Sequence, residues 1–229
     1  MTFEGFIQKA RTAFGPLSDV QESRYRQLGE LYSDWNSKIN VISRKDIDQL
    51  YSHHVLHSLA IAEYIRISMP DLYRILRDPS GEVSILDIGT GGGFPGIPLA
   101  ILFPGGRFTL CDSVGKKIKV ASAVAEAAGL ANVATVNARA EDLPGKYDYI
   151  VSRAVTSMDK FIPWTKGKVS RGIFCLKGGD VAEELGITMQ KYRIRSGSVR
   201  TWKVDSWLED EYFEGKLVVF FEIRDKAIL

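Results

Sequence analysis

The sequence predicts an α/β protein in which an N-terminal helical extension precedes a parallel sheet with covering helices. Two observations support this prediction. From about residue 81 onward, short apolar runs alternate with helical stretches, which is the pattern of a parallel sheet covered by helices. Before that point, apolar residues recur at helical spacing. The chain of 229 residues, 45% of them hydrophobic, is long enough for one large domain with such an extension.

The extension comprises residues 1–80. Its first clear amphipathic stripe places apolar side chains one helical turn apart, at Leu28, Leu31, Tyr32 and Trp35. Ser43, with Asp46 three positions later, resembles the capping box of a second helix that runs to about Leu59. The turn sequence at 78–81 marks the end of the extension.

The second domain, residues 81–229, contains seven predicted strands. They lie near residues 83–88, 108–112, 133–137, 147–152, 172–177, 198–204 and 216–223. Helices are predicted near residues 96–103, 115–129 and 157–169. Because no helix is predicted between the last two strands, they should form a hairpin, with the seventh strand antiparallel to the rest of the sheet.

The most informative segment follows the first of these strands. The sequence Ile-Leu-Asp-Ile at 85–88 leads into five glycines within eight positions, namely Gly89, Gly91, Gly92, Gly93 and Gly96. Glycine has no Cβ and accepts positive φ, so such a loop presents bare backbone to a ligand. Three of the glycines fit the pattern G-x-G-x-x-G of dinucleotide-binding turns, and Asp112 lies about twenty residues on, where a ribose-binding acid is expected. A nicotinamide dinucleotide is therefore one candidate ligand.

Asp87 favours a different ligand. A carboxylate on the strand side of the glycines would repel a pyrophosphate, whereas it would attract the ammonium and sulfonium groups of S-adenosylmethionine. Asp112 suits either ligand, because both carry a ribose with a free diol. The sequence thus predicts S-adenosylmethionine as cofactor, and a NAD-dependent oxidoreductase is the alternative.

Further contacts are expected at the carboxyl ends of the other strands, where ligands of such sheets lie. Ala140 and Glu141 follow the third strand, at the expected height of the adenine ring. Arg153 ends the fourth strand, beside the position of the reactive methyl group. It would act either as a clamp for a carboxylate of cofactor or substrate, or as an ion-pair partner of Asp87.

No residue can be named as a catalytic base or nucleophile. The chain lacks the Asn or Asp followed by two prolines and an aromatic residue that methylation of an adenine amino group calls for. Methylation of a pyrimidine carbon needs a thiolate, but Cys175 stands in an apolar strand, where its pKa should be raised. An acceptor with a free lone pair, such as guanine N7, needs neither device.

Basic residues are concentrated in one part of the chain. Between residues 160 and 203, ten Lys or Arg stand against three acids and are interleaved with aromatic residues. This pattern suits phosphate contact combined with base stacking. The residues predicted to contact nucleic acid are Lys116, Lys117, Lys168, Lys177 and Arg195, together with Arg153.

Several motifs together resemble one family. They are His-Val-Leu-His-Ser-Leu at 54–59, Gly-Phe-Pro-Gly-Ile-Pro at 93–98, Asp-Ser-Val-Gly-Lys-Lys at 112–117 and Ser-Arg-Ala at 152–154. They resemble the RsmG (GidB) family of bacterial 16S ribosomal RNA guanine-N7 methyltransferases, over about residues 35–178. The chain departs from the family pattern at His57, where an acid is common, and at Val155, where an aromatic residue is common.

The resemblance implies a class I S-adenosylmethionine-dependent methyltransferase fold, which is Rossmann-like, with seven strands of which the last is antiparallel. It implies cofactor contacts at Gly89, Phe94, Ala140, Glu141 and Arg153. The implied acceptor is a guanine in the decoding-centre loop of 16S ribosomal RNA, held by the helical extension and by basic residues around the cleft. The full set of expected cofactor contacts is Asp87, Gly89, Gly91, Gly93, Phe94, Asp112, Ala140, Glu141 and Arg153.

The partner expected on these grounds is 16S ribosomal RNA or the 30S particle. His54 is expected either to bridge the N-terminal helices and the cofactor domain or to contact this RNA. No metal is expected, because His53, His54 and His57 have no Cys or second acid placed nearby in the sequence. The net charge of +2 is close to neutral, so the whole molecule is not a generic polyanion binder. The lack of a charged start followed by an apolar stretch, and of any long apolar run, predicts a cytoplasmic, soluble protein, and we expect a monomer. A non-catalytic module that binds donor and RNA is a further alternative.

Overall fold

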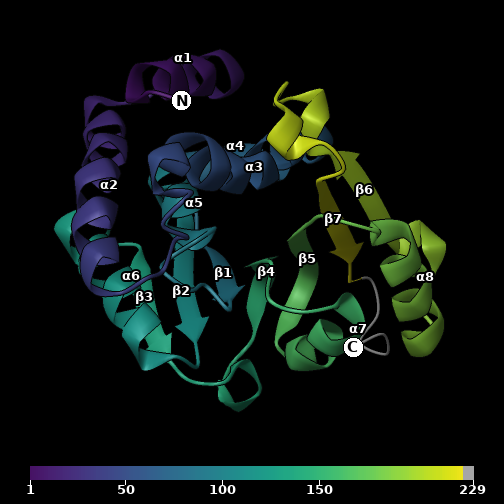
Figure 1. The fold of residues 1–229 in the computed structure, drawn as a ribbon. Helices are drawn as coiled ribbons and strands as arrows, with labels where there is room; N and C mark the ends of the chain where they lie inside the picture. The colour runs from purple at the N-terminus through teal and green to yellow at the C-terminus, as the bar shows by residue number, and fades with distance from the viewer. Residues whose placement is uncertain (224–229) are drawn as a thin grey trace.

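The computed structural model describes residues 1–223; the last six residues of the second domain, 224–229, lie outside the described part. A seven-stranded sheet with the order β3-β2-β1-β4-β5-β7-β6 forms the centre of the molecule (Figure 1). Its strands are β1 (Val83–Ile88), β2 (Gly106–Asp112), β3 (Val133–Asn137), β4 (Tyr147–Arg153), β5 (Val169–Lys177), β6 (Val199–Lys203) and β7 (Leu217–Glu222). All seven strands were predicted from the sequence.

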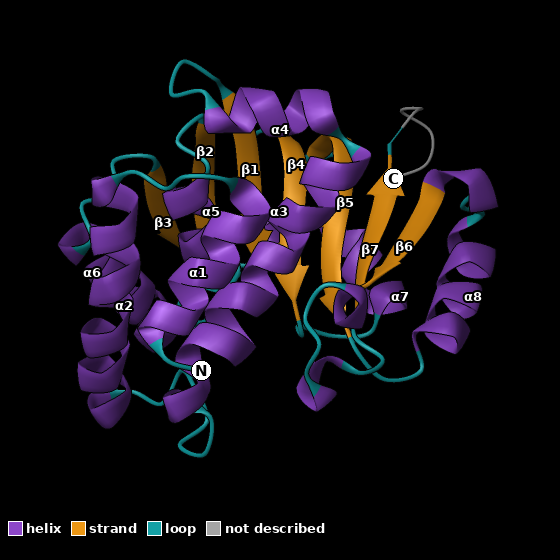
Figure 2. Ribbon diagram, turned by 90° about the horizontal axis from the view of Figure 1, so that it is seen from above, coloured by secondary structure: helices purple, strands orange, loops and turns teal. Residues whose placement is uncertain are grey.

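The strands from β1 to β5 run parallel, and β7 lies antiparallel between β5 and β6. The predictions of an antiparallel seventh strand and of its pairing with the sixth are therefore confirmed. The connection between the two strands is long, because residues 204–216 carry two short 3-10 turns, Val204–Ser206 and Glu211–Phe213. This connection, called the 204–216 segment, lies near the N-terminal helices in both ribbon views (Figures 1 and 2).

Alternation along the strands builds a separate core on each face of the sheet. In β5, Phe174 and Leu176 belong to the core shared with the N-terminal helices, whereas Ile173 and Cys175 belong to the opposite core. Helices α3 (His57–Ser68) and α4 (Pro70–Arg77) lie on the first face, and α7 (Met158–Phe161) on the second (Figure 1). Both faces are covered, as expected for parallel strands.

The other helices of the second domain are α5 (Gly96–Leu102), α6 (Gly115–Ala127) and α8 (Val181–Tyr192). The helix predicted at 157–169 is shorter: α7 gives way to a 3-10 turn, Ile162–Thr165, and β5 already begins at Val169. Helix α8 was not predicted. Its N-cap is Asp180, whose side chain accepts a hydrogen bond from the Glu183 amide.

The extension begins with α1 (Phe3–Phe14) and α2 (Asp19–Lys38). The capping box predicted at Ser43 and Asp46 is wrong, because Asp46 makes no capping hydrogen bond. The chain enters α3 through a 3-10 turn, Ile47–Gln49, and a π-helical stretch, Leu50–Leu56. Histidines of that stretch engage the Asp46 carboxylate instead.

The N-terminal helices share one core with the sheet. Phe6, Tyr25 and Tyr32 are fully buried in the same cluster as Phe174 and Phe220 of β5 and β7. The predicted boundary after residue 80 lies in the turn between α4 and β1. Among residues 1–223, no helix has the length and apolar character that crossing a bilayer requires.

Candidate cofactor and acceptor site

The loop after β1 has the geometry that its glycines predict. Gly89, Gly91 and Gly93 have φ of +70°, +58° and +113°. At Gly96, a Cβ would stand 2.1 Å from Leu110 and 2.8 Å from an oxygen of Asp87, so only glycine lets α5 start this close to the sheet. At Gly89, a Cβ would meet the Val155 side chain at 2.5 Å. The loop can thus pack closely against Asp87, Leu110 and Val155 only because glycine carries no side chain at these positions.

Asp87 lies beneath this loop and is fully buried. Its Oδ2 accepts hydrogen bonds from the Thr90 hydroxyl at 2.7 Å and the Gly96 amide at 2.9 Å, while Oδ1 has no partner among the described residues. Burial raises the pKa of Asp87 to about 7, although the two hydrogen bonds and the charge of Arg153 act in the opposite direction. Asp87 therefore braces the loop.

Asp112, at the end of β2, is oriented by the same loop. Its Oδ2 accepts from the Gly91 amide and its Oδ1 from the Val114 amide, at 2.9 and 2.8 Å. Each carboxylate oxygen keeps a further lone pair. Both carboxylate oxygens of Asp112 can therefore accept a further hydrogen bond from a group in the adjoining pocket.

Two adjoining pockets open at the carboxyl ends of the strands. The first has a volume of about 370 Å³ and is lined by residues that include Ile88, Asp112, Ala140, Glu141 and Trp164. The second, about 450 Å³, is called the acceptor pocket; its lining includes Gly91, Phe94, Arg153, Lys177 and Lys216. Gly89, Lys117 and Ala154 line both pockets. The pockets thus meet where β1 and β4 end.

Of the expected cofactor contacts, Gly89, Gly91, Phe94, Asp112, Ala140, Glu141 and Arg153 line one or both pockets. Asp87 and Gly93 do not. Gly93 instead packs its open face on Ile97 and on the hydroxyl of Tyr32, which a Cβ would approach to 2.4 and 3.0 Å. These two residues shape the loop rather than line the site.

Arg153 is connected to the N-terminal extension through His54. Its Nη2 lies 3.2 Å from His54 Nδ1, and its guanidinium stands 4.9 Å above the Phe94 ring. The other ring nitrogen of His54, Nε2, lies 2.8 Å from Asp46 Oδ2. Because both nitrogens are engaged, His54 bridges the extension and the cofactor domain, which is the first of the two roles expected for it.

His57 also borders the acceptor pocket, but its ring is buried and neither nitrogen has a hydrogen-bond partner among the described residues. Burial, reinforced by the charges of Arg153 and Lys216, holds the pKa of His57 well below its usual value. The imidazole is therefore neutral at physiological pH. The rings of Tyr212 and Phe213 surround it edge-on.

One wall of the acceptor pocket was not predicted from the sequence. Tyr212 and Lys216, from the 204–216 segment, line it. The Tyr212 ring stacks on His53 with centroids 3.5 Å apart, and Lys216 Nζ lies over the same ring at 3.7 Å while donating to the Tyr212 carbonyl. Long-range packing against the π-helical stretch places these residues, and no local motif indicates it.

Both cysteines are inert by environment. Burial raises the pKa of Cys111 to about 11 and of Cys175 to about 12. Neither provides a thiolate near neutral pH. No group of three or more His, Cys, Asp or Glu side chains within residues 1–223 is arranged to hold a metal ion.

The predicted nucleic-acid contacts fall into two groups, one at the carboxyl ends of the strands and one at their amino ends. Lys117 and Lys177 line the acceptor pocket, and Lys116 is exposed beside Lys117 on α6. Lys177 also pairs with Glu184 at 2.7 Å. The structure does not bring Lys168 and Arg195 to this site, and their role as nucleic-acid contacts stays a prediction. Lys168 precedes the amino end of β5, and Arg195 precedes the amino end of β6. Lys168 therefore lies at the opposite end of its strand from the pockets.

Lys168 is also buried, and its Nζ donates to the Leu143 carbonyl at 2.6 Å.

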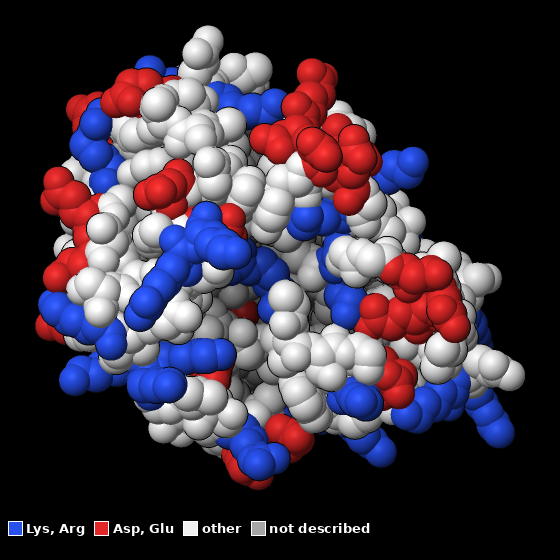
Figure 3. Space-filling view, in the orientation of Figure 1, with Lys and Arg blue, Asp and Glu red and all other residues white. Residues whose placement is uncertain are grey.

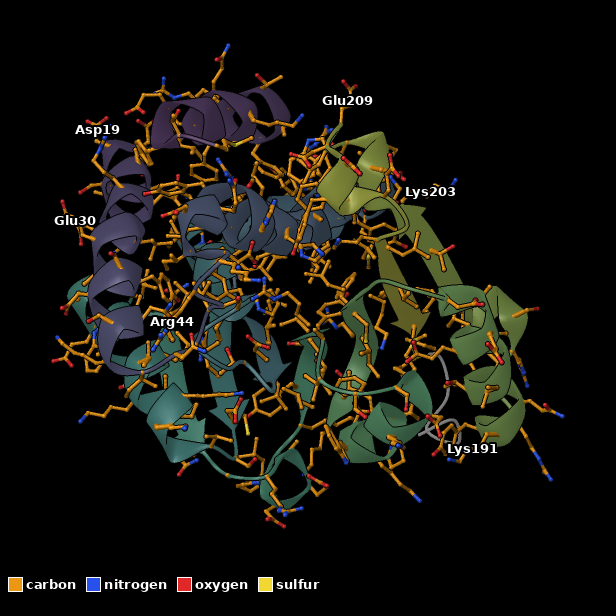
Figure 4. The ribbon with its side chains drawn as sticks, in the orientation of Figure 1. Asp19, Glu30, Arg44, Lys191, Lys203 and Glu209 are labelled. Atoms are coloured by element: carbon orange, nitrogen blue, oxygen red, sulfur yellow. The ribbon has the colours of Figure 1, made fainter. Side chains whose placement is uncertain are left out.

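Conversely, two exposed bases near the site were not predicted. Arg44 and Lys45 lie on the loop between α2 and the π-helical stretch, three and four positions after Val41, which lines the acceptor pocket. Figure 4 shows Arg44 on the side of the molecule opposite Lys191, which lies near the end of α8.

Figure 3 shows how the charged side chains are distributed over one face of the molecule. Lys and Arg side chains gather around a hollow in the middle of this face, whereas acidic side chains gather at its upper right and in a second cluster at its right. The upper right belongs to the 204–216 segment, where Glu209 is labelled in Figure 4. The exposed acids of that segment are Glu209, Asp210, Glu211 and Glu214.

The strand order, the glycine loop after β1 and the acid that ends β2 define the class I methyltransferase fold. Solved structures share this fold at low sequence identity. A 16S ribosomal RNA N2 G1207 methyltransferase of Thermus thermophilus, solved with AdoMet and guanosine, matches with a TM-score of 0.54 and 18% identity over 73% of this chain and 43% of that one. A ribosomal protein L11 methylase of Lactobacillus delbrueckii matches with a TM-score of 0.51 and 14% identity over 72% of this chain and 76% of that one.

Sequence comparison shows the family. The family model described as rRNA small subunit methyltransferase G matches residues 21–206. Proteins called ribosomal RNA small subunit methyltransferase G are 45% identical in Christiangramia forsetii, over 96% of this chain and 99% of the relative, and 47% identical in Porphyromonas gingivalis, over 92% and 90%. The chain belongs to the rRNA small subunit methyltransferase G (GidB) family.

Proposed function

We propose that this protein transfers a methyl group from S-adenosylmethionine to N7 of a guanine in the decoding-centre loop of 16S ribosomal RNA. The observation that carries the proposal is the pair of adjoining pockets, one suited to adenosine and the other basic and open, which meet at Gly89 and Ala154. Family membership supports the substrate class. The protein would act in the cytoplasm, as a monomer, on the RNA or on the 30S particle.

The residues fit S-adenosylmethionine. Asp112 would accept from the ribose hydroxyls, and Ala140 and Glu141 would face the adenine. When it is ionised, buried Asp87, whose Oδ1 has no partner among the described residues, provides a negative potential below the loop that suits a cation. A pyrophosphate would be repelled at the same place, so the nicotinamide alternative is disfavoured. When bound, the cofactor supplies an electrophilic methyl group on a sulfonium.

The acceptor needs little chemical help from the protein. Guanine N7 carries a free lone pair, so the site has to hold this atom in line with the methyl group and to exclude water. Neutral His54 and His57, and two cysteines with raised pKa, provide no strong base or nucleophile beside the pocket. This is the environment that a reaction without proton abstraction requires.

The RNA would approach over the basic side of the open face. Arg44 and Lys45 from the extension, with Lys116 and Lys117 from α6, would contact phosphates. The acids of the 204–216 segment would repel the RNA from the other side. This arrangement replaces Lys168 and Arg195 as contacts.

The direct test is radiolabelled methyl transfer from S-adenosylmethionine to small-subunit RNA and 30S particles from cells that lack this protein. We expect label in 7-methylguanosine after digestion to nucleosides. Donor binding without transfer would support the non-catalytic alternative. Binding of NADH, shown by quenched fluorescence, with none of the methyl donor would support the oxidoreductase.

A further inference from the structure

A series of hydrogen bonds leads from the N-terminal extension to the acceptor pocket. The Asp46 carboxylate is hydrogen-bonded to the rings of two consecutive histidines: its Oδ1 lies 2.6 Å from His53 Nδ1, and its Oδ2 lies 2.8 Å from His54 Nε2. The remaining nitrogen of His54, Nδ1, lies 3.2 Å from Arg153 Nη2. The series thus joins a loop residue, a π-helical residue and the last residue of β4.

The chemistry of the three groups fixes the proton on His54. A guanidinium has only N–H donors, so Nδ1 must accept from Arg153 and Nε2 must carry the proton. That proton is donated to the Asp46 carboxylate. Burial, together with the charge of Arg153, lowers the pKa of His54 to about 4 despite the hydrogen bond to Asp46. The ring is therefore neutral and adds no charge that would repel the guanidinium.

Arg153 is held from three directions. His54 accepts from Nη2, the His53 carbonyl accepts from Nη1 at 3.4 Å, and the Phe94 ring lies beneath the guanidinium. This restraint reduces the side-chain entropy that a ligand contact would otherwise cost. It leaves the remaining N–H groups of the guanidinium for an anion in the acceptor pocket.

The acceptor pocket is built for an anion. Four basic residues line it, namely Lys117, Arg153, Lys177 and Lys216, and none of its lining residues, all of them described, is acidic. The pocket also includes the backbone of Gly89 to Gly92, where the amino-acid end of the proposed cofactor would lie. A carboxylate is the anion at that end, and its two oxygens match the planar guanidinium.

We infer that Asp46 and His54 are positioning residues, which orient Arg153 to bind the carboxylate of the methyl donor. The inference rests on the proposed function in so far as S-adenosylmethionine is the donor. It makes the extension a part of the donor site, because Asp46 fixes the tautomer of His54 and thereby the direction of the guanidinium. Without the Asp46 carboxylate, the ring would be free to place a proton on Nδ1, which would face the N–H groups of Arg153.

The test compares two ligands that differ only in the carboxylate: S-adenosylmethionine and its decarboxylated analogue. The variants are Asp46→Asn and His54→Leu, and Asp48→Asn is the matched control, since Asp48 is an exposed acid two positions away. Calorimetric titration of the wild type and each variant gives the dissociation constants. We expect both variants to bind S-adenosylmethionine about tenfold more weakly and the decarboxylated analogue unchanged, with no effect of Asp48→Asn.

Other outcomes overturn the inference. Equal weakening of both ligands would show that Asp46 only supports the fold, and unchanged binding of both would show that Arg153 does not depend on it. Weaker RNA binding with unchanged donor binding would identify an RNA phosphate as the anion. If the wild type binds neither ligand, the proposed function fails before any variant is compared.

A spectroscopic measurement tests the hydrogen-bond series independently of folding defects. Ring nitrogen-15 shifts of His54 in the wild-type protein distinguish the two neutral tautomers. We expect protonated Nε2 and unprotonated Nδ1. The reverse assignment would break the series at its centre.

Discussion

The phenolic hydroxyl of Tyr32, on α2, donates a hydrogen bond of 2.8 Å to the carbonyl of Gly92 in the glycine loop. The Tyr32 ring also packs on Phe94, with centroids 4.7 Å apart. The loop is therefore supported from the extension as well as from the sheet. A cofactor site that is shaped by two parts of the chain should respond to changes in either.

The first prediction concerns this bond. Tyr32→Phe leaves the buried Gly92 carbonyl without its partner, so we expect a loss of about 1–3 kcal/mol in the free energy of unfolding and weaker donor binding. Tyr25→Phe is the control, since Tyr25 is equally buried and donates to the Pro98 carbonyl in α5 at 2.9 Å. It should cost similar stability, measured by urea unfolding, and leave the donor affinity unchanged. Equal effects on donor affinity would contradict a specific role for Tyr32.

The second prediction separates two glycines of the loop. A Cβ at Gly91 would stand in open space, so only the φ of +58° resists substitution there, whereas a Cβ at Gly89 would also meet Val155 at 2.5 Å. Gly91→Ala should therefore cost about 1–2 kcal/mol in stability, and Gly89→Ala more. Adding Val155→Ala should recover part of the stability at Gly89 and none at Gly91. Urea unfolding of the single and double variants measures this, and no recovery would show that the steric conflict does not matter.

The third prediction uses the pKa of Asp87, which burial raises to about 7. Only the ionised carboxylate attracts a cation, so donor affinity should rise as the pH increases through 7, by about tenfold between pH 6 and 8. In Asp87→Asn the difference between the two pH values should largely vanish. Titrations of wild type and variant at matched ionic strength test this. A wild-type profile that parallels that of the variant would assign the titration to the ligand.

The fourth prediction concerns the RNA face. Replacing Arg44 and Lys45 by Ala should weaken RNA binding and make its dependence on salt shallower, by roughly 0.7–0.9 in the logarithmic slope for each phosphate that is no longer neutralised. Lys191→Ala with Arg195→Ala removes the same charge away from the pockets and should change neither quantity. Filter binding of a small-subunit RNA fragment over a salt series provides both values. A larger effect of the second pair would restore Arg195 as an RNA contact.

The features that the sequence predicts correctly depend on local pattern. All seven strands follow from short apolar runs, and the glycine loop with Asp112 follows from spacing. These features need no knowledge of distant contacts. Helix α8 was missed although Asp180 and Glu183 stand at capping distance, because Gly186 interrupts a weak apolar stripe.

The remaining site residues depend on contacts across the sheet. The concentration of bases between residues 160 and 203 led to the prediction that Lys168 and Arg195 act together with Lys177. In the fold, however, Lys168 and Lys177 stand at opposite ends of β5, and only the end with Lys177 borders the pockets. Asp46 fitted a helix cap by spacing, and only the tertiary structure brings His54 to its carboxylate. Tyr212 and Lys216 belong to irregular turns, and such turns show no repeating pattern of apolar residues from which their position could be predicted.

The fifth prediction follows from the neutral histidines. In the unfolded chain His54 and His57 would protonate near pH 6.5, whereas burial lowers their pKa in the folded protein, for His54 to about 4. As the pH falls from about 6.5 towards 4, the unfolded state binds protons that the folded state does not, so stability is present above this window and is lost within it. His57→Leu removes one of the two groups and two buried nitrogens that lack partners among the described residues.

We expect the His57→Leu variant to be at least as stable as the wild type at neutral pH and to lose less stability on acidification. Thermal unfolding at several pH values from 7 down to about 4.5 measures this. An unchanged acid sensitivity in the variant would mean that His57 has the same pKa in the folded and the unfolded chain, so that burial does not lower it.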